Sequence, residues 1–317
     1  MKNIKLLHFI LPILLFSCNN DLETKSPNVI IVITDDQGYG DIGFNGNPHL
    51  ITPNLDKFAG ESIRFNNFNV SPVCAPTRSS LLTGRYSLRT GVTDTYNGGA
   101  IMSSTEITLA EIFNENNYKT GIFGKWHLGD NYPSRPSDQG FKESLIHLSG
   151  GIGQVGDFTN YYKGATSYYD PILWLNNKQK KYNGYCSDIF TDEAIKFIEN
   201  NKDSPFFCYL SFNAPHTPLQ VPEKYYQMYK DIDPTNINGE TLNMSEKNIL
   251  DAKKIYGMVT NIDENFGKLI NKLDELKLKE NTIVIFMTDN GPQQPRYVSN
   301  LRGLKSQVYN GGIKVPF

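Results

Sequence analysis

The chain has 317 residues, a formal net charge of −2 and an ordinary charged fraction of 20%. This length suits one large α/β domain or two smaller ones. The near-neutral charge argues against a nucleic-acid partner, because proteins that bind nucleic acids carry a basic patch or stripe.

The N-terminus has the pattern of an export signal. Lysines precede an apolar run over 6–16, which is too short to span a bilayer and is typical of a signal-peptide core. The run ends close to a bacterial lipobox, so we expect a signal peptide over 1–17, lipidation of Cys18 and a polar tether over 18–27. A plain signal peptide with an incidental cysteine is the alternative. Either pattern indicates an exported protein, and the lipobox favours a lipoprotein of the periplasm or outer membrane of a Gram-negative bacterium, anchored in the membrane.

Strand and helix patterns alternate along the rest of the chain. The β-branched run over 28–34 is typical of a strand buried on both faces of a parallel sheet. The patterns then predict a helix near 53–60, a strand over 63–69, a helix beginning within 77–82, a helix over 108–116, a strand over 119–123, a helix over 188–200, a strand over 205–212, an amphipathic helix over 245–276 and a strand over 282–287. Such alternation implies an α/β fold, with a mostly parallel central sheet flanked by helices on both faces.

One long segment does not fit this alternation. Residues 149–183 are rich in Gly, Tyr and Asn, and a connection of this length is usually functional or disordered. Cys186 and Cys208 lie in apolar surroundings and are expected to be packed thiols rather than a disulfide.

Two predicted strands end in oxygen-bearing side chains. Asp35 and Asp36 follow the first strand, and Asp289 and Asn290 follow the last. Carboxylate and amide oxygens without thiolate or imidazole suit a hard cation, Ca²⁺ or Mg²⁺. Each pair alone could equally be a turn or a cap, but their shared place after strands favours a metal site.

Basic side chains and histidines also stand in polar clusters, most of which lie just past the ends of predicted strands. They could neutralise the oxygens of an anionic ester and protonate its leaving group. Taken singly, the arginine could be structural, the lysines solvated and the histidines ordinary loop residues. The candidates are Arg78, Lys125, His127, His216 and Lys305.

The most specific motif begins at Cys74. It reads Cys-Ala-Pro-Thr-Arg and is followed by Leu-Thr-Gly-Arg over 82–85; a buried cysteine beside a turn proline is the alternative. With this motif the chain resembles the type I sulfatases, formylglycine-dependent members of the alkaline-phosphatase-like superfamily. The segment over 150–154 with Tyr161 and Tyr162 looks like arylsulfatase B-like bacterial sulfatases that act on carbohydrates. The motifs, in the family's order, are Thr34-Asp35-Asp36-Gln37-Gly38, Cys74-Ala75-Pro76-Thr77-Arg78, Gly124-Lys125-Trp126-His127, Asn213-Ala214-Pro215-His216 and Thr288-Asp289-Asn290-Gly291.

The resemblance implies the cofactors. A separate maturation enzyme, formylglycine-generating or anaerobic, would convert Cys74 to formylglycine (3-oxoalanine), whose hydrated aldehyde is the nucleophile. One hydroxyl attacks sulfur and the alcohol leaves, after which the second hydroxyl deprotonates and expels sulfate. Ca²⁺ would be held by Asp35, Asp36, Asp289 and Asn290, with the modified Cys74 completing the shell.

The resemblance also implies roles for the other residues and for the substrate. Arg78 would steady the formylglycine, and His127 would accept the proton whose loss ejects sulfate. Lys125, His216 and Lys305 would bind sulfate oxygens, and His216 would protonate the leaving alcohol. The substrate would be a sulfated glycan, with the segment 149–183 facing it.

The chain departs from the family pattern in two places. Asn310 precedes a double glycine where the family often has glutamate. The sequence also stops at Phe317, where sulfatases usually continue through further strands and a smaller subdomain. We therefore expect residues 28–317 to form a C-terminally incomplete sulfatase domain, and a natural truncation of this kind would expose a sheet edge.

Two other functions stay open. A phosphonate or phosphodiester hydrolase of the same superfamily would use similar chemistry, although such enzymes usually have a more histidine-rich Mn²⁺ or Zn²⁺ site. A non-catalytic lipoprotein that binds sulfated glycan is the alternative from another class.

Overall fold

The computed structural model describes residues 25–154 and 167–317. The expected signal peptide, Cys18, Tyr161 and Tyr162 lie outside the described residues. Within the described ranges, no helix is long and apolar enough to cross a membrane.

A seven-stranded sheet forms the centre of the fold, in the order β5-β4-β3-β2-β6-β1-β9. The strands are β1 (Asn28–Thr34), β2 (Lys119–Lys125), β3 (Glu143–His147), β4 (Ile172–Leu175), β5 (Lys178–Lys181), β6 (Phe206–Ser211) and β9 (Thr282–Thr288). The neighbours from β3 to β9 pair in parallel, and β4 and β5 are antiparallel. The predicted mostly parallel sheet is confirmed.

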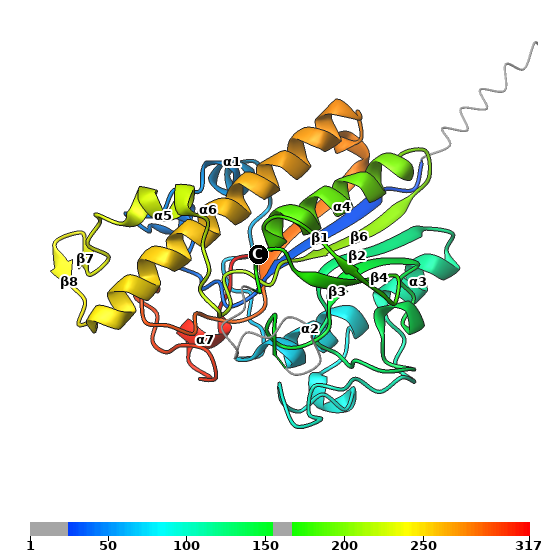
Figure 1. Cartoon of the computed structure of the whole chain (residues 1–317), viewed down its shortest axis with the longest axis horizontal. Coiled ribbons are helices and arrows are strands. Elements are labelled where there is room, and N and C mark those ends of the chain that lie inside the picture. Colours follow the sequence, from blue (N-terminus) through cyan, green and yellow to red (C-terminus); the bar gives the residue numbers. More distant parts are fainter. Residues whose placement is uncertain (1–24, 155–166) are drawn as a thin grey trace, which may run out of the picture.

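Helices cover both faces of this sheet (Figure 1). They are α1 (Pro53–Glu61), α2 (Cys74–Thr83), α3 (Leu109–Glu115), α4 (Cys186–Asn200), α5 (Glu223–Tyr229), α6 (Glu246–Glu275) and α7 (Asn310–Ile313), and a two-stranded ribbon pairs β7 (Asn236–Ile237) with β8 (Glu240–Thr241). Along β1, Ile30 and Val32 pack in a core with α1, α4 and α6. Ile31 and Ile33 point to the other core, with α2 and α3. This alternation explains why a strand buried on both faces has a continuous apolar sequence.

The long helix α6 shows how sequence determines one of these layers. Ser245 caps it by accepting a hydrogen bond of 3.2 Å from the backbone of Asn248. Ile262, Phe266 and Leu269 recur at the spacing of one helical face and are buried. The predicted helix over 245–276 is therefore confirmed to within a residue at each end.

The predicted strand over 63–69 is wrong. Ile63 is 87% exposed, and the segment makes only an isolated bridge between Asn69 and Lys314. The amide of Phe65 bonds the carbonyl of Phe317 instead, at 3.0 Å. The segment 63–69 forms no ladder because the chain beside it, residues 314–317, lies in no strand.

The predictions also missed or shortened several elements. They did not include β3 or α5, and the segment 149–183 contains the hairpin β4–β5. Helix α2 begins at Cys74 itself, earlier than 77. The short strands and the seven-residue helix α5 lack the repeated periodicity that makes longer elements recognisable.

Among the described strands, β9 ends the sheet, and its outer side borders a groove. The groove has a volume of about 680 Å³ and is lined mainly by α1, α6 and β9. Ile283 on β9 is 50% exposed. The edge strand β9 is thus partly exposed, and none of the predicted site residues lines the groove.

Candidate active site

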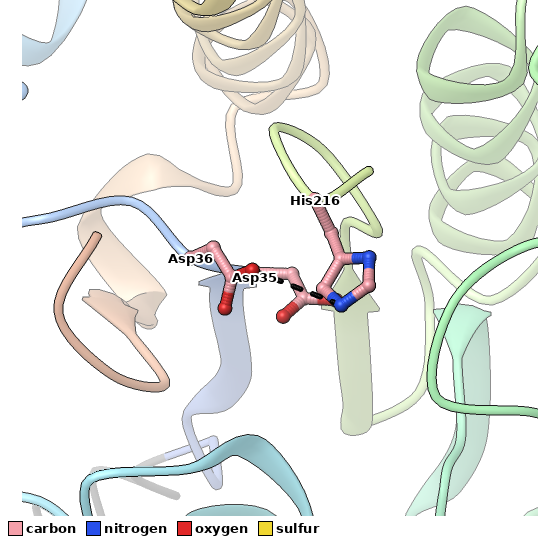
Figure 2. Close-up of side chains that lie close together, drawn as sticks. All are labelled: Asp35, Asp36 and His216. Atoms are coloured by element: carbon pink, nitrogen blue, oxygen red, sulfur yellow. Dashed lines mark ion pairs between the residues drawn. The ribbon is translucent and has the colours of Figure 1, made fainter. Parts of the chain in front are cut away.

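Apart from Cys18, all predicted site residues meet at the carboxyl-terminal edge of the parallel strands. Asp35 and Asp36 follow β1, Lys125 ends β2, and Asp289 follows β9. His216 lies beyond β6, in a loop that brings it beside the two aspartates (Figure 2). Because these strands are parallel neighbours, residues far apart in sequence converge here.

Lysines pair with both aspartates that follow β1. Lys125 Nζ lies 2.6 Å from Asp35 Oδ2, and Lys305 Nζ lies 2.6 Å from Asp36 Oδ1. Burial alone would raise the pKa of Asp36, but Lys305 and His216 outweigh it and hold this pKa below its usual value. The structure thus places Lys305, which lies in no strand or helix, directly in the site.

Arg78 binds the carboxylate that follows β9. Its Nε and Nη2 donate to Asp289 Oδ2 at 3.0 and 2.7 Å, and its Nη1 donates to Ser211 Oγ at 2.6 Å. Burial would lower the pKa of Arg78, but Asp289 outweighs it and raises the pKa above the usual value. The guanidinium is therefore a permanent charge that positions Asp289. Ser211 was not among the site residues predicted from the sequence.

Cys74 is the first residue of α2 and lies against His127. The Cys74 Sγ is 3.4 Å from Nδ1 of the imidazole. The other ring nitrogen, Nε2, is 2.9 Å from the carbonyl oxygen of Thr95, and a carbonyl only accepts, so Nε2 carries the proton. Burial and the charge of Lys125 lower the pKa of His127 to about 3. The neutral ring can therefore accept a proton at Nδ1, on the side of Cys74.

His216 has the opposite tautomer. Its Nδ1 is 2.7 Å from the carbonyl of Thr217 and carries the proton, while Nε2 is 3.7 Å from Asp36 Oδ2. Burial lowers the pKa of His216 to about 3, although Asp36 opposes this shift. His216 can donate a proton from Nε2 only in its imidazolium form, and the negative charge of Asp36 stabilises that form.

The site has unpaired oxygens that fit a hard cation. Asp35 Oδ1, Asp36 Oδ2 and Asn290 Oδ1 are buried and have no hydrogen-bond partner in the described part of the chain. Ligand atoms of Asp35, Cys74 and Asp289 lie within 4.8 Å of one another. Burial and the neighbouring Asp35 raise the pKa of Asp289 to about 6, which is the repulsion that a divalent cation would relieve. The donor set fits Ca²⁺ or Mg²⁺.

A buried ion pair behind the site holds the backbone of Asp36. Asp36 has a left-handed φ of 60°, which is uncommon for a residue other than glycine. Arg296 Nη2 donates to the Asp36 carbonyl at 2.7 Å, and Arg296 Nε donates to both oxygens of Asp41 at 2.9 Å. Both side chains of this pair are fully buried. Arg296 was missed because nothing near it in sequence distinguishes it from a surface arginine.

Replacing Arg296 with alanine should therefore weaken both the fold and the cation site. Loss of the Arg296 guanidinium leaves the Asp41 carboxylate buried without a partner, which costs about 3–5 kcal/mol of unfolding free energy. Release of the Asp36 backbone should also lower the affinity of the carboxylate cluster for a divalent cation by about 10- to 100-fold, the usual effect of losing a group that orients a metal ligand. Urea denaturation and calcium titration measure the two effects. The exposed Arg89→Ala is the matched control; an unchanged calcium affinity in Arg296→Ala would show that the pair is structural only.

The fold is an α/β domain in which one sheet edge gathers buried carboxylates that could hold a metal ion, together with Lys125 and Lys305. Residues 27–317 match the protein-family model described as Sulfatase. The chain therefore belongs to the sulfatase family, as the motifs predicted.

Individual relatives agree with this assignment. The chain is 30% identical over 324 residues to an ulvan-active sulfatase of Formosa agariphila, and 30% identical over 309 residues to mouse arylsulfatase J. These alignments cover 96% and 92% of this chain but only 59% and 47% of the relatives. The crystal structure of Ps i-CgsB is similar with a TM-score of 0.77 and 32% identity, covering 92% of this chain and 65% of that one. The chain thus spans about half the length of the curated relatives it matches.

Proposed function

We propose that the protein hydrolyses sulfate esters of a carbohydrate. The observation that carries the proposal is the position of Cys74, at the start of α2 and 3.4 Å from a neutral His127, beside an oxygen-rich cation site with two lysines. The ulvan-active sulfatase is a relative, and Ps i-CgsB has been solved in complex with k-i-k-neocarrahexaose. These relatives support a sulfated glycan as the substrate class.

We further propose that Cys74 is converted to formylglycine by a maturation enzyme and that the cation is Ca²⁺. Formylglycine supplies a nucleophilic oxygen, and calcium supplies positive charge to the substrate's oxygens. Asp35, Asp36, Asp289 and Asn290 would hold the calcium through the buried oxygens described above. The Cys74 sulfur stands where the modified residue carries its oxygens.

The remaining residues bind the anion and move protons. His127 Nδ1 has a free lone pair directed at residue 74, so it can take a proton from the modified side chain there. Lys125 and Lys305 would neutralise sulfate oxygens from two sides, and His216 would give a proton to the departing alcohol. Arg78, already bonded to Asp289 and Ser211, acts by keeping the site rigid around residue 74.

A sulfate-release assay tests this function. The complete protein is produced together with a maturation enzyme and incubated with sulfated polysaccharides. We expect sulfate release and an intact mass about 18 Da lower than the unmodified chain. Hydrolysis of phosphonates or phosphodiesters alone would favour the phosphonate or phosphodiester hydrolase alternative. A phosphonate monoester hydrolase of Agrobacterium radiobacter shares the fold at a TM-score of 0.64. If protein with Cys74 converted to formylglycine bound a sulfated polysaccharide without releasing sulfate, the non-catalytic alternative would be favoured.

Removal of the cation should lower thermal stability. A chelator leaves the carboxylates around Asp289 without the cation, and a ligand at 100 times its Kd contributes about 2.7 kcal/mol to the unfolding free energy. We expect the melting temperature to fall on chelation and to recover with Ca²⁺. The variant Asp289→Asn is the control, because it should melt at a temperature that no longer depends on calcium. A wild-type melting temperature indifferent to both treatments would contradict the cation site.

We also propose that the protein is exported and anchored to a membrane through a lipid on Cys18. The apolar run over 6–16 and the lipobox-like sequence support this. The variant Cys18→Ala should move the protein from the membrane fraction to the soluble fraction. Equal membrane association of both forms would contradict the anchor.

A further inference from the structure

Asn213 is a buried residue beside the site whose side chain makes no hydrogen bond within the part of the chain that the structure describes. It lies two residues beyond β6 and is fully buried. Its backbone is fixed, because its carbonyl accepts hydrogen bonds from Tyr168 Oη at 2.9 Å and from the His216 amide at 3.1 Å. Neither Nδ2 nor Oδ1 of Asn213 has a hydrogen-bond partner among the described residues.

Other buried asparagines of this protein use their amides. Asn290 Nδ2 donates to Asp36 at 2.7 Å. Asn265 Nδ2 donates to Asp188, also at 2.7 Å. Within the described ranges, Asn213 is the buried asparagine with both amide atoms unpaired. Burial of a polar side chain without partners is destabilising, so Asn213 is a poor choice for a purely structural position.

The sheet topology places Asn213 on the anion-binding side of the site. Strand β6 lies between β2 and β1, and the ion pair from Lys125 at the end of β2 to Asp35 after β1 spans the end of β6. The chain around Asn213 touches this pair on both sides: Ser211 Oγ donates to the Lys125 carbonyl at 2.7 Å, and the Asp35 amide donates to the Ala214 carbonyl at 3.1 Å.

The proposed cation ligands follow β1, the neighbour of β6 on the side away from β2, and β9 beyond it. The Asn290 bond to Asp36 joins the ends of β9 and β1. Lys125, on the β2 side, is the positive group nearest to Asn213 in the strand order, and His216 follows three residues later. An anion held by Lys125 would therefore lie beside the Asn213 amide.

We propose that Asn213 is a substrate-binding residue whose Nδ2 donates a hydrogen bond to an oxygen of the substrate's sulfate group. This inference rests on the proposed function, because it takes the anion to be a sulfate. The amide is held by a rigid backbone and makes no hydrogen bond to any described residue, so none of those residues must release it before it binds the anion. Such a preorganised donor binds without reorganisation, and binding would remove the penalty of the unpaired amide.

Asn213→Leu tests the proposal, because leucine has a similar size and cannot form hydrogen bonds. The probe is inorganic sulfate, added to the complete protein at saturating Ca²⁺. Without sulfate, we expect Asn213→Leu to melt at the same temperature as wild type or higher, because an unpaired polar group has been removed. With sulfate, the Kd measured from the thermal shift should rise about tenfold. Asn213→Ala, which removes the amide without adding a branch, should show the same rise in Kd.

Asn265→Leu is the matched control, a buried asparagine in α6 that is bonded to Asp188 in α4. It should melt at a lower temperature and keep the wild-type Kd for sulfate. A lower melting temperature of Asn213→Leu with an unchanged sulfate Kd would overturn the proposal and make Asn213 structural. A loss of calcium affinity with unchanged sulfate binding would overturn it in favour of a cation ligand.

The binding experiment separates this inference from the proposed function. Sulfate binding is read from stability and needs no turnover. Wild-type protein that binds sulfate through Asn213 but releases none from esters would support the inference and contradict the hydrolase. Normal turnover in Asn213→Leu, with an unchanged KM and sulfate Kd, would support the hydrolase and overturn the inference. Failure of wild type to bind sulfate would overturn the inference.

Discussion

Cys74→Ala should abolish sulfate release from the matured protein. The proposed reaction divides one displacement into two steps, and both need an oxygen on residue 74. Removal of the nucleophile from an active site commonly lowers kcat by about 10⁶-fold, so we expect kcat/KM to fall at least about 10⁴-fold. The fold should survive, since alanine fits wherever the cysteine does at the first turn of α2. Initial-rate measurements and a melting curve on the same sample measure both effects.

Cys208→Ala is the matched control for this experiment. Cys208 is also a fully buried cysteine, but it lies inside β6 and its side chain is part of the core shared with α4 and α6. We expect the variant to lose stability by a kilocalorie or two, about the cost of deleting a buried group, and to keep its turnover. If Cys74→Ala and Cys208→Ala released sulfate at equal rates, residue 74 would not be the nucleophile.

The charges of the site are balanced before any cation binds. Asp35, Asp36 and Asp289 are each paired with one basic side chain, and the histidine that contacts Cys74 is neutral. A site of this kind has little net attraction for an anion, and a divalent cation would give it a net positive charge. Calcium and sulfate binding should therefore be coupled.

This coupling gives a measurable result. Coulombic attraction between bound groups makes each ligand raise the affinity for the other by the same factor. Allosteric coupling energies of 1–3 kcal/mol are typical, so we expect the sulfate Kd to improve by about 5- to 150-fold at saturating calcium. Titrating sulfate with and without calcium measures the factor. Equal sulfate affinities in the two titrations would mean that the lysines alone bind the anion.

The long strands could be predicted closely from the sequence. The run over 28–34 is buried on both faces, so its five central positions, 29–33, all carry the same apolar signal. The grouping of Asp35, Lys125 and Asp289 also followed from the sequence, because parallel strands bring their carboxyl ends to one edge. The predicted strand over 63–69 was wrong because a local pattern of apolar and polar residues cannot report which backbone lies beside the segment.

The missed residues have a common physical cause. Ser211 ends the apolar strand β6, and its polarity has meaning only once the neighbouring strands are known. The contact from Arg296 to Asp41 joins positions more than 250 residues apart. Thr95 contacts His127 through its backbone carbonyl, for which its residue type gives no signal at all. The roles of these residues come from contacts made in the tertiary structure, and no local sequence pattern marks them.

Arg78→Ala should be the most destabilising single change in the site. The guanidinium is fully buried and makes three hydrogen bonds, to Asp289 and Ser211. Its loss leaves the Asp289 carboxylate buried without its partner, for which about 3–5 kcal/mol of unfolding free energy is typical. Because native domains have total stabilities of about 5–15 kcal/mol, the variant should unfold at a much lower urea concentration. It should also lose calcium binding, since Asp289 is a proposed ligand.

Arg78→Lys separates charge from geometry. Lysine keeps the positive charge, but its ammonium cannot reproduce the fork of donors that reaches Asp289 and Ser211 together. We expect a folded protein with intermediate stability and a strongly reduced kcat, because Asp289 and Ser211 would no longer be held in one arrangement. The control is Arg85→Ala, which removes a half-exposed arginine paired with Glu106 and should cost about 1 kcal/mol or less. Wild-type turnover in Arg78→Lys would show that the site needs only the charge at this position and not its directed hydrogen bonds.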